Sequence, residues 1–173
     1  MNARLLISLA ALLAYAPDVH ASQDTTLVLR VVAVEAVESF TAGSGMLART
    51  FTPASGNRFV AVTLQPTGDG GFNNDGLVLI AAVGGQTYRY LAVSPKDPIW
   101  IAAGGVMDLD RTDITFHYEG DKSWFEFNSV DRASTVSWTG SGARLKVLFE
   151  VNKPPADLRL RHGNRRPVPL SPR

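Results

Sequence analysis

The segment LKVLFEVNKPPADLRLR, residues 145–161, decides the fold. Its first half predicts a strand in which Val147, Phe149 and Val151 face a core, because successive side chains of a strand point to opposite faces. The other face carries Lys146, Leu148 and Glu150. The Asn-Lys-Pro-Pro stretch at 152–155 ends this strand, since two prolines cannot donate hydrogen bonds to a ladder. The segment is therefore two strands joined by a break.

The second half of this segment predicts a last strand over 156–162. Leu158 and Leu160 point inward there, and Arg159 and Arg161 point outward. After Gly163 proline recurs at every second or third position in GNRRPVPLSPR. Such a stretch offers little to pack, so residues 163–173 are predicted to form a disordered or extended tail.

The rest of the chain repeats short runs rich in Val, Leu, Ile, Phe and Thr, bounded by Gly, Pro, Asn and Asp. The clearest runs lie at 25–40, 58–66, 76–93 and 134–138. The run at 25–40 is apolar on both faces, which predicts a strand buried on both sides or one that bends between two sheets. Gly84-Gly85 divides 76–93 into a hairpin. The pattern predicts an all-β, immunoglobulin-like sandwich of seven to nine strands with few or no helices.

The N-terminus has the layout of a secretory signal peptide over residues 1–21. Arg4 precedes an apolar run at 5–16, and Val19 and Ala21 occupy the −3 and −1 positions before Ser22. A membrane anchor would need about 20 apolar residues, more than this run or any later one supplies. We therefore expect an exported, soluble protein, periplasmic or secreted, with a sandwich domain over 22–162.

The chain has no cysteine, which excludes disulfides, thiol chemistry and a lipid anchor on an N-terminal cysteine. A domain of about 150 residues buries roughly 68–70% of its unfolded surface, so a disulfide-free core suffices. We expect a monomer without a cofactor.

Charge is distributed unevenly. Residues 22–157 contain 11 basic and 15 acidic residues, a net charge of −4, whereas the chain beyond Asp157 has five arginines and no acid. Such asymmetry is typical of an interaction tail. The hypothesis is that Arg161, Arg165 and Arg166 contact an anionic protein or envelope partner. Without interleaved aromatics, they do not indicate specific nucleic-acid binding.

Two acidic stretches are weak candidates for a calcium site. Asp108, Asp110 and Asp113 follow one another in an extended segment, but the glycine and terminal glutamate of a calcium loop are missing. A solvated turn before a strand explains them as well. Turn chemistry likewise explains the second stretch, GDGGFNNDG, whose candidate ligands are Asp69, Asn73, Asn74 and Asp75.

Catalytic motifs are absent from the sequence. There is no Gly-x-Ser-x-Gly, P-loop or dinucleotide fingerprint, and His117 and His162 are far apart. Carboxylates that meet only in space remain the basis of one alternative, a hydrolase that uses Asp108, Asp110, Glu119 and Glu126. In KSWFEFNS, Phe125 and Phe127 share a core face, which leaves Trp124 on the other face as a contact candidate.

Three strand patterns, RFVAVTLQ, LVLIAAVGGQTYRY and LKVLFEVNKPPADLRLR, follow each other along the chain. The positions that carry the patterns are Phe59, Val60, Gly85, Tyr88, Leu148, Phe149, Val151, Pro154, Leu158 and Leu160. In this order they resemble small exported bacterial domains with a telokin-like, immunoglobulin-like sandwich, the immunoprotective extracellular protein class. The chain departs from that class at Gln65-Pro66, where an asparagine is usual, and over 94–131. The resemblance implies the fold and export, and no catalytic residues.

These observations favour a binding or adaptor module of the cell envelope. Two alternatives stay open: the carboxylate-based hydrolase, and a structural envelope accessory that docks through its basic tail.

Overall fold

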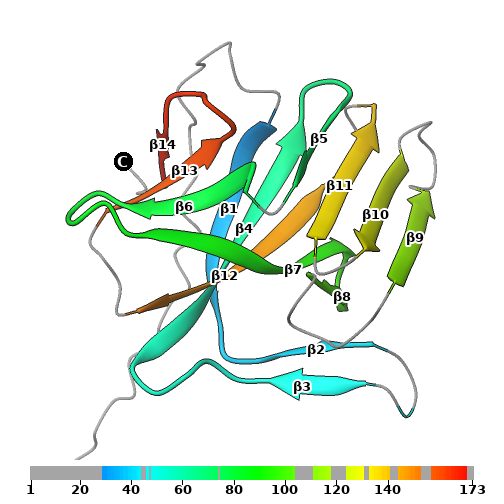
Figure 1. The fold of residues 1–173 in the computed structure, drawn as a ribbon, viewed down its shortest axis with the longest axis horizontal. Coiled ribbons are helices and arrows are strands. Elements are labelled where there is room, and N and C mark those ends of the chain that lie inside the picture. Colours follow the sequence, from blue (N-terminus) through cyan, green and yellow to red (C-terminus); the bar gives the residue numbers. More distant parts are fainter. Residues whose placement is uncertain are drawn as a thin grey trace, which may run out of the picture.

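The computed structural model describes residues 29–43, 46, 48–73, 75–103, 111–117, 124–130, 133–140, 144–152 and 157–170. These residues form fourteen β-strands and no α-helix (Figure 1). The prediction of an all-β, sandwich-like fold is confirmed. The strands outnumber the seven to nine predicted, because short segments such as β2 (Phe40–Ala42), β3 (Arg49–Phe51) and β14 (Val168–Pro169) were not recognised in the sequence.

A large curled sheet forms most of the molecule. Its main path has the order β1-β4-β12-β7-β6-β13-β14, and β8 joins β7 to β2, which pairs with β3. The strands are β1 (Leu29–Val37), β2 (Phe40–Ala42), β3 (Arg49–Phe51), β4 (Asn57–Pro66), β6 (Leu77–Ala81), β7 (Thr87–Lys96), β8 (Ile99–Ala102), β12 (Leu145–Asn152), β13 (Leu158–His162) and β14 (Val168–Pro169). All pairs are antiparallel except that of β2 with β8.

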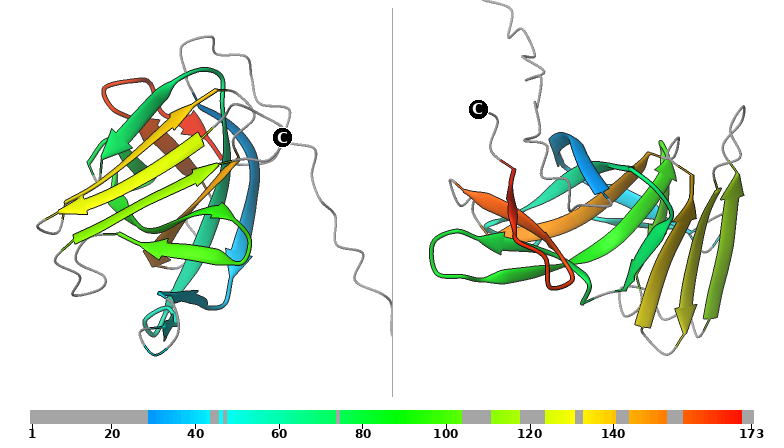
Figure 2. Two further views of the ribbon diagram at one scale, coloured as in Figure 1. Left: turned by 90° about the vertical axis from the view of Figure 1, so that its right-hand side faces the viewer. Right: turned by 90° about the horizontal axis from the view of Figure 1, so that it is seen from above.

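A second sheet of four antiparallel strands stands at one side of the curled sheet (Figure 2). Its order is β5-β11-β10-β9, with β5 (Gly70–Asn73), β9 (Arg111–His117), β10 (Trp124–Val130) and β11 (Ala133–Thr139). The close pairing of β5 with β11 requires a glycine, because a Cβ on Gly71 would lie 2.6 Å from the carbonyl oxygen of Val136.

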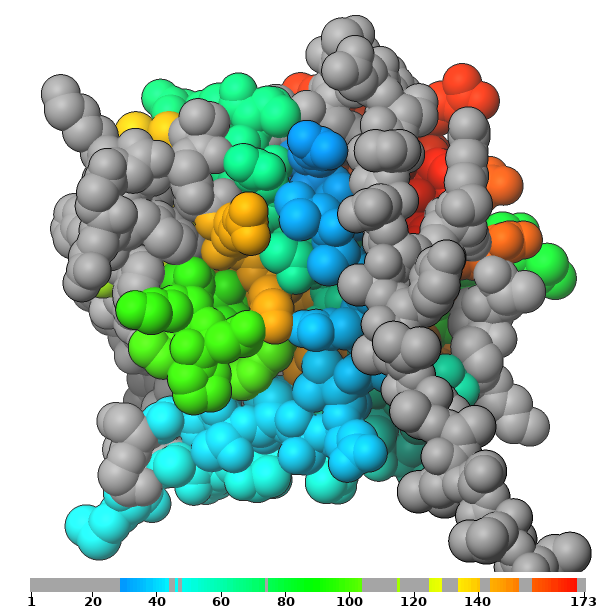
Figure 3. All heavy atoms as spheres, turned by 180° about the vertical axis from the view of Figure 1, so that it is seen from behind, coloured from blue at the N-terminus to red at the C-terminus, as the bar shows by residue number. Residues whose placement is uncertain are grey.

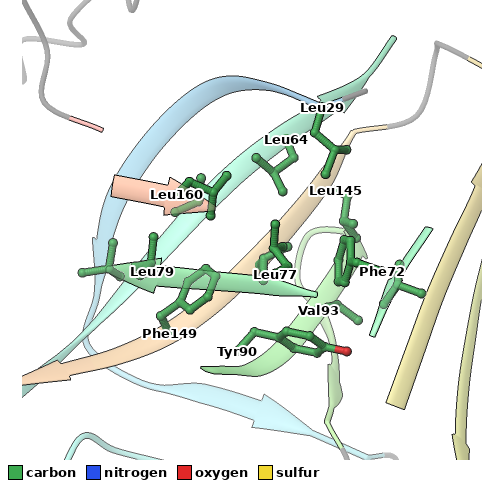
Figure 4. Close-up of a cluster of buried hydrophobic side chains, with 14 of the residues drawn as sticks. Leu29, Leu64, Phe72, Leu77, Leu79, Tyr90, Val93, Leu145, Phe149 and Leu160 are labelled. Carbon is green, nitrogen blue, oxygen red and sulfur yellow. The ribbon is translucent and has the colours of Figure 1, made fainter. Parts of the chain in front are cut away.

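Strand β12 lies at the centre of the large sheet, between β4 and β7. Val147, Phe149 and Val151 are fully buried in the core between the sheets, as the alternation predicted. Figure 4 shows Phe149 and Leu145 beside side chains of β4, β6 and β13. The predicted core positions Phe125 and Phe127 of β10 are also buried in this cluster.

The outer face of the same strands carries a second apolar cluster. Leu148 alternates with the core residues but is fully buried, together with Phe59 and Ala61 of β4. The segments β2, β3 and β8 cover this face, and Phe40 contacts Phe51, Phe59 and Trp100 there. Figure 3 shows them beside β1 on the back of the molecule. Strands β4 and β12 are therefore buried on both faces.

The predicted strand at 25–40 is only partly as expected. Within its described residues, β1 pairs with β4 alone and forms one end of the main path, and Ala33 to Ala36 are exposed. The alternative of burial on both sides is therefore wrong. The chain does bend after Val37, at Glu38 and Ser39, and continues as β2. A register shift between Val31 and Ala33 interrupts the regular pairing of β1 with β4.

The hairpin predicted at 76–93 is present as β6 and β7. Leu79 pairs with Tyr88, and the connecting residues include Gly84 and Gly85 at φ values of 82° and 64°. A side chain is strained at such positive φ, so glycine suits both positions.

Of the two alternatives predicted for the end of the chain, disordered or extended, the described residues as far as Leu170 adopt the extended one. Val168 and Pro169 form β14, which pairs with Leu160 and Arg159 of β13. Leu170 is buried in the main core, and its backbone N–H donates to the Leu158 carbonyl over 2.8 Å. One apolar side chain and one strand edge are enough to fix this segment as far as Leu170.

Candidate functional site

Arginine side chains gather on the outer face of β7, β6 and β13, which are adjacent in the large sheet (Figure 1). Val78 of β6 pairs with Arg89 on one side and Arg161 on the other. Side chains directly opposite in an antiparallel sheet share a face, with Cβ atoms about 5 Å apart. The two arginines therefore flank Val78 in one row.

The next row toward the β6–β7 turn contains Thr87, Ile80 and Arg159. The residues between these two rows, Tyr88, Leu79 and Leu160, point into the main core. The alternation predicted for β13 is thus confirmed, with Leu160 buried and Arg159 exposed. Core packing on one face of β13 holds its arginines on the other.

Arg165 and Arg166 are exposed in the turn between β13 and β14. The Arg165 backbone N–H donates to the His162 carbonyl over 3.2 Å, which anchors the turn to β13. We define the arginine face as Arg89, Arg159, Arg161, Arg165 and Arg166. Two carboxylates accompany it: Asp75, 2.7 Å from Arg89, and Asp157 at the start of β13. The group carries a net positive charge.

His162 attaches β13 to the second sheet. Its Nε2 lies 3.2 Å from the Gly71 carbonyl oxygen of β5, and its ring packs edge-on against Phe72. Burial lowers the pKa of His162, and the charge of Arg165 lowers it further, although the contact with Gly71 acts in the opposite direction. His162 is therefore neutral at neutral pH, and the positive charge of this region comes from the arginines.

A separate ion-pair cluster lies on the outer face of β12. The Lys146 ammonium is 2.6 Å from both the Glu35 and the Asp97 carboxylates. Burial opposes the charged form of Lys146, but hydrogen bonds and charge from Asp97 and Glu35 outweigh it and raise its pKa. Glu35 and Asp97 thus form a close pair of carboxylates, and glycoside hydrolysis uses such a pair. The Lys146 ammonium contacts both carboxylates and neutralises part of their charge, so the arrangement is an ion-pair network that links β12 to β1 and to the residue after β7.

The loop residues considered for calcium have other roles. The Asp69 carboxylate accepts from Gly140 N–H over 2.8 Å, and the Asn73 side-chain oxygen accepts from Gly76 N–H over 2.7 Å. Asp75 pairs with Arg89. No group of three or more His, Cys, Asp or Glu residues that could hold a metal ion occurs within the described ranges.

The remaining candidates are only partly placed. Asp108, Asp110, Asn74 and Glu119 lie outside the described residues. Asp113 is on β9 opposite Asn128, and Trp124 is on β10 between His117 and Thr139. Glu126 is half-buried on β10, opposite Thr115 and Ser137. The predicted Arg161, Arg165 and Arg166 do come together, on and beside β13.

Sequence reasoning missed the contribution of Arg89. It alternates with Tyr88 and Tyr90, which marks it as outward, but only the pairing of β6 with both neighbours brings it beside Arg161. Arg159 was recognised as outward and was not singled out for a partner. The signal for both lies in cross-strand register, which is non-local.

No protein family, curated protein or solved structure matches the chain. The resemblance to telokin-like exported domains thus stays a prediction. The part of the chain that the structure describes contains no apolar helix of membrane-spanning length.

Proposed function

We propose that the protein is an exported, monomeric binding module of the cell envelope that engages an anionic partner through the arginine face. The observation that carries this proposal is the cross-strand row of Arg89, Val78 and Arg161, with Arg159 in the next row. The turn with Arg165 and Arg166 extends the same region. Fixed positive charge on a packed sheet attracts anions at a small ordering cost.

The alternative of a docking accessory merges with this proposal, because two of the arginines beyond Asp157 lie on β13 and two lie in the turn that follows it. The packing of Leu160 and Leu170 holds the arginines on β13 and beside it. Arginines on a packed strand also favour bidentate contacts to carboxylate or phosphate groups.

The test uses a fluorescent polyaspartate probe and the protein without residues 1–21. Fluorescence anisotropy measures the binding affinity at low and at high salt. The double variant Arg159→Gln/Arg161→Gln should weaken binding at least tenfold. Its matched control is Arg49→Gln/Arg58→Gln, which removes two exposed arginines from β3 and β4. Equal losses in both doubles would mean that only net charge matters, and no binding by the unaltered protein would refute the proposal.

A further inference from the structure

The β6–β7 hairpin ends in an apolar tip that the arginine face does not explain. Val83 is 85% exposed, and its neighbours Ala82, Gly84 and Gly85 are exposed as well. No charged residue occurs from 76 to 88. The hairpin extends from the body of the molecule in Figure 1 and in the right panel of Figure 2. One exposed valine is ordinary on a protein surface, but this one stands at the end of a protruding hairpin beside the arginine face.

The tip and the arginine face are parts of one structure. The backbone N–H of Ala82 donates to the Asp157 carbonyl over 2.9 Å, which ties the tip to the start of β13. Behind the tip come the row with Ile80 and Arg159, then the row with Val78, Arg89 and Arg161. Apolar and cationic groups therefore follow each other in a fixed order along the hairpin.

The spacing of these layers fits a lipid surface. Val83 is three residues beyond Ile80 and lies in the turn that follows β6, so it reaches less than about 10 Å past the Arg159 row, the span of three fully extended residues. Interfacial segments bury their apolar face roughly 5–10 Å into the boundary between headgroups and acyl chains. With the tip at that depth, Arg159 and Arg161 lie at the level of the headgroup phosphates.

We propose that the anionic partner is a lipid bilayer, into which the β6–β7 hairpin inserts Val83 while Arg159 and Arg161 contact headgroup phosphates. The inference rests on the proposed function and names its partner. A folded acidic protein would match the arginines, but it would also need an apolar pocket at the matching distance to cover the tip. Asp157 lies beside Ala82 and therefore nearer the tip than Arg159, and Asp75 pairs with Arg89. Both carboxylates weaken the attraction to phosphate, but five arginines against two carboxylates leave the region with a net positive charge.

Because the chain has no cysteine, a single introduced cysteine can be labelled at a chosen position. Val83→Cys is labelled with a polarity-sensitive fluorophore, and Met46→Cys, on the β2–β3 connection and 103% exposed, is the matched control. Each labelled protein, without residues 1–21, is titrated with vesicles of phosphatidylglycerol and phosphatidylcholine or of phosphatidylcholine alone. The inference predicts a blue shift for the label at 83 with the anionic vesicles only, and none at 46.

Unlabelled variants measure the two layers separately. Arg159→Gln/Arg161→Gln should lower vesicle affinity roughly 30-fold, since each cation near an anionic surface contributes about 1 kcal/mol. Val83→Ser should lower it about tenfold and leave polyaspartate binding unchanged. Arg49→Gln/Arg58→Gln should retain vesicle affinity.

The outcomes separate this inference from the proposed function. Polyaspartate binding without vesicle binding, or vesicle binding without a shift at 83, overturns lipid insertion and leaves the proposed function standing. A shift at 46 in place of 83 overturns it as well. If the protein binds neither polyaspartate nor the anionic vesicles, both proposals are removed.

Discussion

The two faces of strands β4 and β12 are both buried, but different partners cover them. Through Val62, Val147 and Phe149, the inner face packs against the second sheet and against the paired strands β6 and β13. The outer face is covered by β2, β3 and β8, with Phe40 stacked on Phe51 at 4.8 Å and edge-on to Phe59 at 5.4 Å. The inner core joins the two sheets, and the outer cluster attaches a local cover.

This difference predicts that the loss of an inner side chain lowers the free energy of unfolding more than the loss of an outer one. Loss of an inner side chain weakens the contact on which the whole sandwich depends. Loss of an outer side chain loosens short strands whose rim, at Phe51 and Trp100, is only half-buried. The following variants test this ranking.

The largest effect is expected for Phe149→Ala, which removes a fully buried ring from the centre of the inner core. A substitution of this kind costs about 3–5 kcal/mol, from lost transfer energy and the cavity that remains. Urea unfolding followed by tryptophan fluorescence measures it. A loss below about 1 kcal/mol would contradict the assigned register.

Phe40→Ala should cost about 3 kcal/mol, less than Phe149→Ala, because the half-buried rings around it can close in on the space. The double variant sharpens the comparison. Since the two rings belong to separate clusters, their effects should add within about 0.5 kcal/mol. A larger coupling energy would show that the two faces form a single cooperative core.

Sequence patterns predicted the inner face well and the outer face poorly. A period of two places Val147, Phe149 and Val151 on one side, and this is a local property of the strand. Leu148 is buried because β2 and β8, about 50 to 100 residues earlier in the chain, cover it. No local pattern reports such a contact.

The same limit applies to the candidate site. Alternation alone placed Arg159 and Arg161 outward, correctly. Their position beside Arg89 depends on the register of β6 with both of its neighbours. The packing of Leu170 depends on the edge that β13 offers to β14.

A smaller effect is expected for Tyr90→Phe, at a polar link between the sheets. The Tyr90 hydroxyl lies 2.8 Å from Oγ of the buried Ser134 on β11. Removal of such a hydrogen bond costs about 1 kcal/mol. Burial raises the pKa of Tyr90 to about 12, although the bond to Ser134 lowers it.

The raised pKa adds a pH test to this variant. The unfolded chain loses the tyrosine proton near the ordinary pKa of 10.0, before the folded protein does. The stabilising contribution is therefore present below pH 10 and is lost as the pH rises through the folded value. Unfolding free energies measured across this range should fall less steeply for Tyr90→Phe, and parallel curves would contradict the burial of Tyr90.

The smallest effect concerns the second polar link, His162. Its pKa is lowered below the ordinary 6.5, so the unfolded chain takes up a proton first as the pH falls. The contribution of His162 is present above pH 6.5 and is lost as the pH falls toward the folded value. His162→Gln keeps a donor for the Gly71 carbonyl, and its stability should change less between pH 7 and pH 5. The same pH dependence in both proteins would show that His162 titrates normally.

The most direct test of the central claim, that the arginine face is the binding surface, is an NMR titration of the labelled protein with polyaspartate. The account predicts that the amide signals that move most belong to β13, the β13–β14 turn and the adjoining parts of β6 and β7. Movement concentrated on β2, β3 and β8, or on β9 and β10, would place the binding surface elsewhere and contradict the account.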